Sequence, residues 1–187
     1  MPATGASDGA RAITRVRIET SKGPFVVEVN REWAPRGAER FLELVRTKFF
    51  DDSRFFRVRE KYIAQFGIAG DPAVTKKWIG REFPDDPGKT SYVRGTFAFA
   101  MTGPDQRSTQ IYINLVDNTQ LDAQGFSPVG RVVEGMDVVD RIYSGYGEDA
   151  GGGLRLGKQQ KMLEEGNRHL DANFPRLDRL LQARVVR

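Results

Sequence analysis

Two apolar segments carry the side chains of this chain that could do chemistry. The first, residues 55–72, contains Arg57 and Gln65, and the second, residues 94–114, contains Gln110. Aromatic and aliphatic residues surround these three polar side chains, and neither segment places a nucleophile beside a general base. This combination is typical of a shallow apolar groove that holds one fixed cation.

The spacing within these segments resembles that of the cyclophilins, the peptidyl-prolyl cis-trans isomerases. Arg57 and Gln65 recur at the spacing of that family, apolar residues lie between them, and the pattern G-x-x-G-D-P follows at residues 67–72. The resemblance runs from Thr14 to Arg141. It implies a bacterial-like member that acts on proline-containing polypeptides, assists protein folding, and needs neither a cofactor nor a metal.

The chemistry of that reaction suits the residues present. Rotation about a peptide C–N bond costs ~18–20 kcal/mol, and X–Pro bonds isomerise in tens to hundreds of seconds. A catalyst must favour the twisted amide over both planar forms, and no covalent bond has to break. In the twisted amide the prolyl nitrogen gains a lone pair, to which an arginine can donate at any physiological pH. Arg57 is the candidate for this donor.

The resemblance also assigns roles to the residues around Arg57. Gln65 matches the glutamine that contacts the substrate carbonyl and orients the arginine. The implied binding residues form a proline pocket and a groove for the residues before the proline. The pocket would contain Tyr62, Ile63, Tyr112, Leu121 and Phe126, and the groove Ala100, Met101, Thr102 and Gln110.

Three positions depart from the common pattern of the family. Tyr112 stands where a phenylalanine is frequent, and Phe126 lies about where many members have histidine. Gln120 stands where many members carry the tryptophan associated with tight cyclosporin binding. We therefore expect weak cyclosporin binding, whereas the arginine donor is retained.

The N-terminal part of the chain has clear signals of secondary structure. Val16 and Ile18 alternate with charged residues, which predicts a half-buried strand. A turn at residues 21–24 and an apolar run at 25–29 complete a hairpin. A helix should begin near Pro35, because apolar residues then recur at helical spacing up to Val45.

The rest of the domain reads mainly as short strands. They run from Arg54 to Val133, with a long loop at residues 71–93, and a short helix follows at 135–143. Residues 179–186 alternate again and should pair with the first strand. The predicted fold is mainly β: a closed eight-stranded antiparallel β-barrel, cyclophilin-like, capped by two helices, with an extra C-terminal helix.

The predicted domain organisation is simple. Residues 1–12 form a flexible N-terminal tail, and residues 13–187 form one cyclophilin-like domain. Within it, residues 145–175 form a helical insertion before the last strand, with a glycine-rich start at 145–153 and a helix interrupted at Gly166. The sequence does not indicate a purpose for this insertion.

Composition limits the remaining function classes. Apolar residues make up 39% of the chain and charged residues 29%, as in ordinary globular proteins, and the absence of cysteine excludes disulfides and thiolate metal sites. The net charge of +4 is spread along the chain, so we expect no nucleic-acid partner, and no stretch is apolar enough for a membrane span. We expect a monomer, cytoplasmic as the chain stands, or periplasmic or secreted if a leader has been removed.

Two other hypotheses stay open beside an active isomerase. A catalytically weak proline-peptide-binding module or chaperone would keep the groove, but it would have less need of a cation at the twisting nitrogen. A basic scaffold that uses the C-terminal helix would need clustered basic and aromatic residues, which the sequence lacks. The sole histidine, His169, lies in that helix and has no triad or metal partners in its sequence context, so we expect a surface residue.

Overall fold

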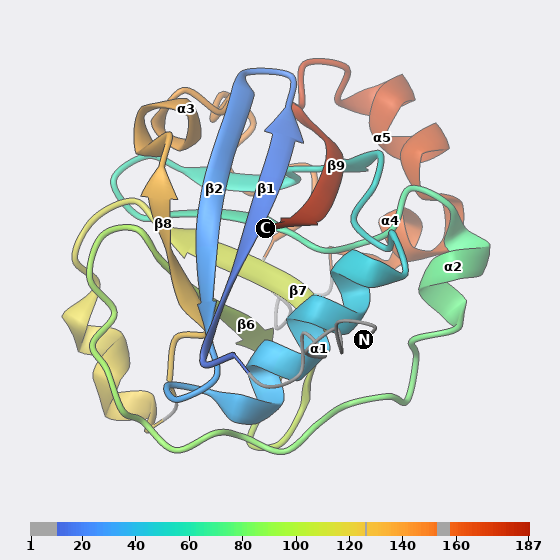
Figure 1. The fold of residues 1–187 in the computed structure, drawn as a ribbon. Helices are drawn as coiled ribbons and strands as arrows, with labels where there is room; N and C mark the ends of the chain where they lie inside the picture. The colour runs from blue at the N-terminus through green and yellow to red at the C-terminus, as the bar shows by residue number, and fades with distance from the viewer. Residues whose placement is uncertain (1–10, 126, 153–157) are drawn as a thin grey trace, which may run out of the picture.

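The computed structural model describes residues 11–125, 127–152 and 158–187. Its main feature is one strongly curled antiparallel sheet of nine strands in the order β3-β9-β1-β2-β8-β6-β7-β5-β4 (Figure 1). The strands are β1 Ile13–Thr20, β2 Gly23–Asn30, β3 Ser53–Arg54, β4 Arg57–Arg59, β5 Ile63–Phe66, β6 Thr96–Met101, β7 Arg107–Asn114, β8 Gly130–Glu134 and β9 Arg179–Val186.

Short helices surround this sheet. Among the described residues they are α1 Pro35–Arg46, α2 Pro72–Lys76, the 3-10 helix η2 Thr119–Gln124, α3 Met136–Asp140, α4 Gln160–Glu165 and α5 Asn167–Asn173. Figure 1 shows α2, α4 and α5 grouped on one side of the molecule, with α3 on the opposite side. None of the described helices has the length and apolar character that crossing a membrane requires.

The N-terminal hairpin and the first helix form as predicted. In β1, Val16 and Ile18 are buried and alternate with exposed neighbours, and β1 pairs along its whole length with β2. Helix α1 has Pro35 in its first turn and buries the face that includes Phe41 and Val45. The Phe41 ring packs against core aromatic rings, with 5.0 Å between its centroid and that of Phe97.

The strand count differs from the predicted eight because one strand is broken. β3 pairs with β9, and β4 pairs with β5, but Phe55 and Phe56 between them leave the ladder. Both side chains are almost fully buried, Phe55 in the main core and Phe56 in a second apolar cluster outside it. The backbone must therefore direct these two adjacent side chains into two different apolar clusters. This interrupts the strand, so β3 and β4 are separate strands at the two ends of the sheet order.

Two further differences concern helices. The loop predicted at residues 71–93 contains α2, which begins where the Asp71 carboxylate accepts a hydrogen bond from the Ala73 backbone N–H at 2.8 Å. The helix predicted within the insertion, after its glycine-rich start at residues 145–153, is present as α4 and α5, separated at Gly166 as the sequence indicated. Residues 154–157 of that helix, and residues 1–10 of the predicted tail, lie outside the described residues.

The pairing of the last strand is confirmed. β9 pairs antiparallel with β1, so that Val16 lies opposite Val185 and Ile18 opposite Ala183. On its other side, β9 pairs with β3, where Ser53 lies opposite Leu180. Segments from the two ends of the chain therefore hold the sheet that carries Arg57.

Candidate active site

The hairpin of β4 and β5 brings Arg57 and Gln65 together. The two residues lie directly opposite each other in the antiparallel register, which places their side chains on the same face of the sheet. The Arg57 Nη1 donates a hydrogen bond to the Gln65 Oε1 at 2.9 Å. The predicted catalytic pair is therefore a contact in the fold.

A second acceptor of Arg57 was missed by the sequence analysis. The Glu148 Oε1 accepts hydrogen bonds from the Arg57 Nε at 2.8 Å and from its Nη2 at 2.5 Å. The hydrogen bond from Arg57 lowers the pKa of the Glu148 carboxyl below its ordinary value. Glu148 lies in the glycine-rich start of the predicted insertion, where no periodicity or motif points to it.

A row of three glutamines extends from Arg57 into the protein. The Gln65 Nε2 donates to the Gln110 Oε1 at 3.0 Å. Gln110 and Gln159 then exchange hydrogen bonds in both directions, at 2.8 and 3.1 Å, and the Gln159 Nε2 also donates to the Gly152 carbonyl at 2.9 Å. All three side chains are buried. The structure therefore joins Gln110 to Arg57 and Gln65, and Gln110 is hydrogen-bonded to Gln159 on its other side.

Most of the predicted binding residues lie in one apolar cluster beside this pair. β5, β6, β7 and η2 each contribute side chains to it, and Tyr92 and Ala98, which the sequence analysis did not single out, belong to it as well. The predicted residues in the cluster are Tyr62, Ile63, Ala100, Met101, Tyr112 and Leu121. Thr102 is exposed and hydrogen-bonded to Gln106, outside the cluster. Phe126 lies outside the described residues.

Two tyrosines form the floor of this cluster. The rings of Tyr92 and Tyr112 stack with 6.3 Å between their centroids and 14° between their planes. Burial raises the pKa of both hydroxyls above their ordinary values, so both remain neutral at physiological pH. The hydroxyl of Tyr112, the departure from the frequent phenylalanine, is therefore accommodated without introducing a charge.

A buried arginine, Arg107, contacts Met101 of the apolar cluster. Arg107 on β7 donates a hydrogen bond to the Met101 Sδ at 3.3 Å and forms an ion pair with Asp85. Burial lowers the pKa of its guanidinium to about 10, so the group is still charged at neutral pH. Arg107 was not predicted as a site residue, because a charged residue in a loop-to-strand junction gives no sequence signal of burial.

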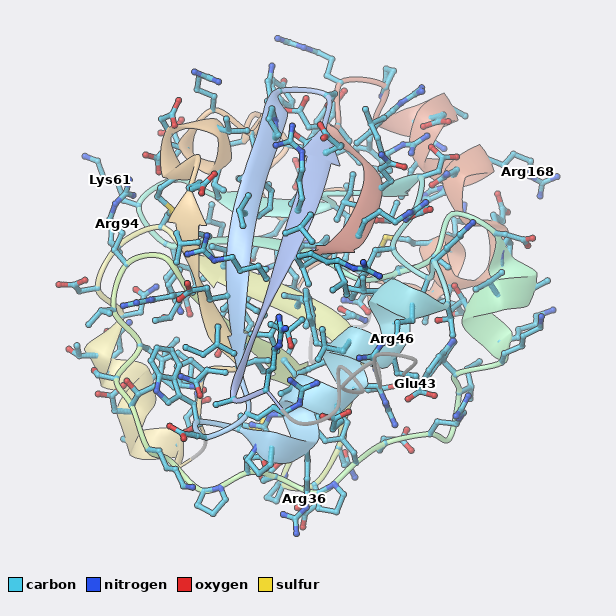
Figure 2. The ribbon with its side chains drawn as sticks, in the orientation of Figure 1. Arg36, Glu43, Arg46, Lys61, Arg94 and Arg168 are labelled. Atoms are coloured by element: carbon cyan, nitrogen blue, oxygen red, sulfur yellow. The ribbon has the colours of Figure 1, made fainter. Side chains whose placement is uncertain are left out.

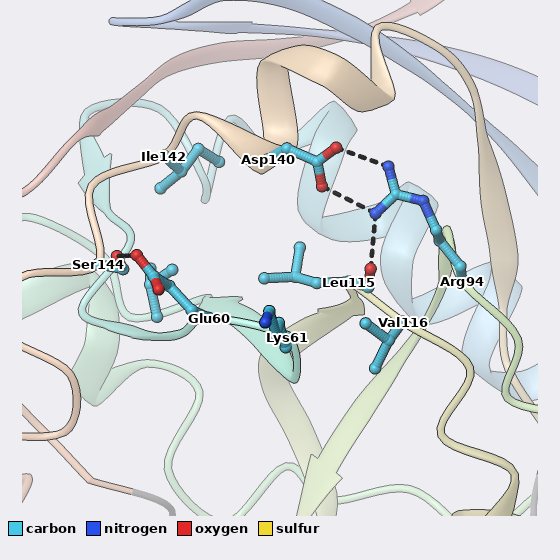
Figure 3. Close-up of a pocket in the computed structure, with 9 residues that line it drawn as sticks. Glu60, Lys61, Arg94, Leu115, Val116, Asp140, Ile142 and Ser144 are labelled. Atoms are coloured by element: carbon cyan, nitrogen blue, oxygen red, sulfur yellow. Dashed lines mark hydrogen bonds and ion pairs between the residues drawn. The ribbon is translucent and has the colours of Figure 1, made fainter.

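A separate pocket is lined in part by residues of the β4–β5 turn (Figure 3). Its volume is about 330 Å³, and Lys61, Arg94 and Asp140 are among its lining residues. The Asp140 carboxylate accepts hydrogen bonds from both Nη atoms of Arg94, at 2.6 and 2.8 Å. The charge of Arg94 in this pocket is therefore already paired with a carboxylate of the protein. This pocket does not contain Arg57 or Gln65, which separates it from the candidate active site.

Charged side chains project from many elements of the molecule. In Figure 2, Arg36 and Arg46 project from α1, Arg168 from α5, and Lys61 and Arg94 from the opposite side of the fold. Within the described part of the chain, no cluster of three or more His, Cys, Asp or Glu residues could hold a metal ion. The predicted absence of a nucleic-acid partner and of a metal stays a prediction.

Comparisons with known proteins agree with this geometry. The sequence model of the family described as cyclophilin type peptidyl-prolyl cis-trans isomerase/CLD matches residues 15–162. A peptidyl-prolyl cis-trans isomerase of Arabidopsis thaliana is 34% identical over 135 residues, which cover 69% of this chain and 80% of that protein. One of Acinetobacter baylyi is 32% identical over 138 residues, 71% of this chain and 73% of that protein.

Solved structures show the same fold at lower sequence identity. A cyclophilin type peptidyl-prolyl cis-trans isomerase of Cryptosporidium parvum superposes with a TM-score of 0.67 at 19% identity, over 94% of this chain and 98% of that one. The family match takes in the β4–β5 hairpin, the apolar cluster and eight of the nine strands in whole or in large part. The chain therefore belongs to the cyclophilin-type peptidyl-prolyl cis-trans isomerase family.

Proposed function

We propose that Arg57 is the catalytic donor with which this peptidyl-prolyl cis-trans isomerase, EC 5.2.1.8, rotates X–Pro bonds in polypeptides. The observation that carries the proposal is the Arg57–Gln65 hydrogen bond at the edge of the apolar cluster. A cation held beside an apolar surface is the arrangement that a twisted prolyl amide requires, because the ring needs apolar contact and the nitrogen lone pair needs a donor.

The guanidinium has donors left for a substrate. Of its five N–H groups, those on Nε, Nη1 and Nη2 that face Gln65 and Glu148 are engaged in the hydrogen bonds described above. One N–H on each of Nη1 and Nη2 is not engaged by these two partners. In the proposal, either of them donates to the prolyl nitrogen when the amide twists and its lone pair localises, and Gln65 contacts the substrate carbonyl.

The apolar cluster would bind the substrate around this donor. In the proposal, the proline ring packs on Tyr62, Ile63, Tyr112 and Leu121, and Phe126 completes the pocket. The residues before the proline lie along Ala100, Met101 and Thr102, with Gln110 behind them. Burial of a proline ring against such side chains contributes about 25 cal/mol per Å² of apolar area removed from water.

A protease-coupled assay on a short X–Pro peptide tests the function. The isomerase should accelerate cis-to-trans conversion in proportion to its concentration, and substitution of Arg57 should abolish most of that acceleration. No acceleration by the folded wild-type protein at any concentration would contradict the proposal.

Two contacts favour a second candidate, a proline-peptide-binding module or chaperone with weak catalysis. Glu148 neutralises part of the charge on Arg57, and Gln159 covers Gln110. The first contact lowers the net charge at Arg57, and the second occupies hydrogen-bonding groups of Gln110, so fewer polar groups are available to a substrate. A protein that binds an X–Pro peptide without changing its isomerisation rate would be such a module.

Several finer properties are proposals as well. If residues 53–59 are counted as one bent strand, the sheet corresponds to the expected closed barrel of eight strands. We propose a monomer that assists folding of proline-containing polypeptides, in the cytoplasm or, alternatively, in the periplasm or outside the cell. The bacterial-like character and the status of residues 145–175 as an insertion also remain proposals.

A further inference from the structure

The described residues between α3 and β9, which are 141–152 and 158–178, pack beside the strand that carries Arg57. Phe56 and Ile68 from the barrel pack with Ala150, Met162 and Leu170 of this segment in one buried apolar cluster. Phe56 is the direct neighbour of Arg57 in the sequence. The docking surface of the segment and the candidate catalytic residue therefore belong to the same short stretch of backbone.

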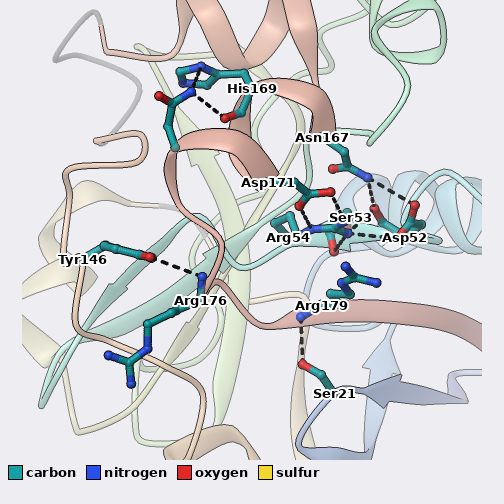
Figure 4. Close-up of polar contacts among 11 residues, drawn as sticks. Ser21, Asp52, Ser53, Arg54, Tyr146, Asn167, His169, Asp171, Arg176 and Arg179 are labelled. Atoms are coloured by element: carbon teal, nitrogen blue, oxygen red, sulfur yellow. Dashed lines mark hydrogen bonds and ion pairs between the residues drawn. The ribbon is translucent and has the colours of Figure 1, made fainter.

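Polar contacts add to this docking (Figure 4). Arg54, whose side chain is only 3% exposed, forms a two-bond ion pair with Asp171 on α5 at 3.0 and 3.1 Å. The Asn167 side chain donates to the Asp52 carbonyl at 2.7 Å. Asp171 itself is 49% exposed, so the ion pair is buried only at its arginine end. A cluster of buried apolar side chains together with such a contact is typical of a fixed part of a fold, in contrast to a segment that opens and closes.

The docked segment holds both ends of the hydrogen-bond network around Arg57. At one end, Glu148 binds the Nε and Nη2 edge of the guanidinium. At the other end, Gln159 binds Gln110, which binds Gln65, which in turn accepts from the Arg57 Nη1. Glu148 and Gln159, which hold the two ends of this network, both lie between α3 and β9.

We propose that Glu148 is a positioning residue for Arg57, and that the segment carrying it is a working part of the active site. The inference rests on the proposed role of Arg57. A single acceptor on Nη1 leaves the guanidinium plane free to turn about the Cδ–Nε bond, whereas a second acceptor on the Nε and Nη2 edge fixes that plane. The remaining N–H groups on Nη1 and Nη2 then point in a defined direction before the substrate arrives.

The hydrogen bonds of Glu148 allow its effect on the orientation of Arg57 to be tested separately from the effect of its charge. Both hydrogen bonds from Arg57 end on the same oxygen, Oε1. A glutamine at this position has one carbonyl oxygen that can accept both bonds, but it carries no charge. Glu148→Gln should therefore preserve the orientation of Arg57, whereas Glu148→Ala removes it.

The test compares these two variants with a matched control. Asp140 is a second carboxylate that binds an arginine through two bonds, and it lies in the separate pocket of Figure 3, so Asp140→Ala removes an equivalent ion pair elsewhere. Glu148→Ala should lower kcat/KM for an X–Pro peptide about ten- to hundredfold, with peptide Kd nearly unchanged. Glu148→Gln should retain at least half of the activity, and Asp140→Ala should match the wild type. In an Arg57→Ala background, Glu148→Ala should cause no further loss.

A readout independent of activity is the Arg57 side-chain Nε–H signal in ¹H–¹⁵N NMR. Its exchange with water should be slow in the wild type and in Glu148→Gln, and clearly faster in Glu148→Ala. Wild-type activity in folded Glu148→Ala, or an unchanged exchange rate, would overturn the inference. If the wild type is inactive while the exchange rate responds as expected, the proposed function fails and the positioning contact stands.

Discussion

Replacement of Arg57 by alanine is the most direct perturbation of the proposed mechanism. It removes the only donor that the proposal assigns to the prolyl nitrogen. Loss of a single fixed donor to a transition-state charge costs about 10²–10³ in rate in other enzymes, and we expect kcat/KM to fall by about one to three orders of magnitude, or roughly 1.4–4 kcal/mol. Arg57→Lys should also be poor, because one ammonium group cannot reproduce the planar fork that reaches Gln65 and Glu148 on different edges.

The structure also predicts a cost in stability for Arg57→Ala that the sequence did not indicate. The Gln65 side chain, in a residue only 1% exposed, loses the hydrogen bond that its Oε1 accepts from Arg57. A buried acceptor without a partner costs about 1–3 kcal/mol. Glu148 is less affected, because its side chain is 27% exposed and Arg59 lies 3.7 Å away. We therefore expect the free energy of unfolding to fall by about 1–3 kcal/mol.

The matched control for this experiment is Arg94→Ala. Arg94 also binds a carboxylate through two hydrogen bonds, but it lies away from the candidate site and its side chain is 43% exposed. Its loss should change the free energy of unfolding by about 1 kcal/mol or less and leave kcat/KM unchanged. A protease-coupled assay and urea unfolding of the three proteins measure both effects. Full activity in folded Arg57→Ala would refute the assignment of the donor.

Three further predictions concern inhibition, pH and the docked segment. Gln120→Trp should tighten cyclosporin binding by about 1–3 kcal/mol in a titration, because it adds apolar area at the rim; equal affinities would show that Gln120 does not face the ligand. Activity should be flat from about pH 6 to 8.5 and insensitive to EDTA, since the mechanism transfers no proton. The hydrogen bond from Arg57 lowers the pKa of Glu148. Its contact with Arg57 is therefore fully present at every pH above the ordinary pKa of a carboxyl, and it is lost only when the pH falls below that value. A bell-shaped dependence of activity on pH between about 6 and 8.5 would show that a general acid or base takes part in the reaction. Gly166→Ala should lower the melting temperature by several degrees, because the residue has φ of 59° and its Cβ would lie 2.1 Å from the Gly70 carbonyl oxygen. Gly80→Ala, at a positive φ in open space, should cost much less.

The resemblance to the cyclophilins predicted Arg57, Gln65 and most members of the apolar cluster, and the hairpin explains why the first two residues are in contact. Arg57 and Gln65 lie on one tight hairpin, where strand pairing alone sets them opposite each other. The alternation in residues 13–20 likewise shows which face of β1 is buried. Burial along β9 does not alternate in this way, because Leu180 and Ala183 are buried with two exposed residues between them, where the register with β1 shifts. The start of α2 could also have been predicted, because Asp71 followed by Pro72 is a frequent beginning of a helix.

The partners of Arg57 outside the hairpin could not be predicted in this way. Glu148 lies 91 residues further along the chain, and Gln159 is 49 residues from Gln110. Neither belongs to a periodic pattern, and their positions depend on how a separate segment docks. The available signal is the pair Phe55 and Phe56: two large apolar neighbours in an extended stretch point in opposite directions, so a second apolar layer must cover one of them.

The position of β1 between β2 and β9 has a consequence for synthesis of the protein. Ser21 and Arg179, which are hydrogen-bonded across this part of the sheet, are 158 residues apart in the sequence. At about 5–20 residues per second, a ribosome exposes one edge of β1 for on the order of ten seconds before its partner is made. An open strand edge can pair with other nascent chains, and charged side chains discourage this. Arg15, Arg17 and Glu19 on the outer face of β1 provide such charges while the chain is incomplete.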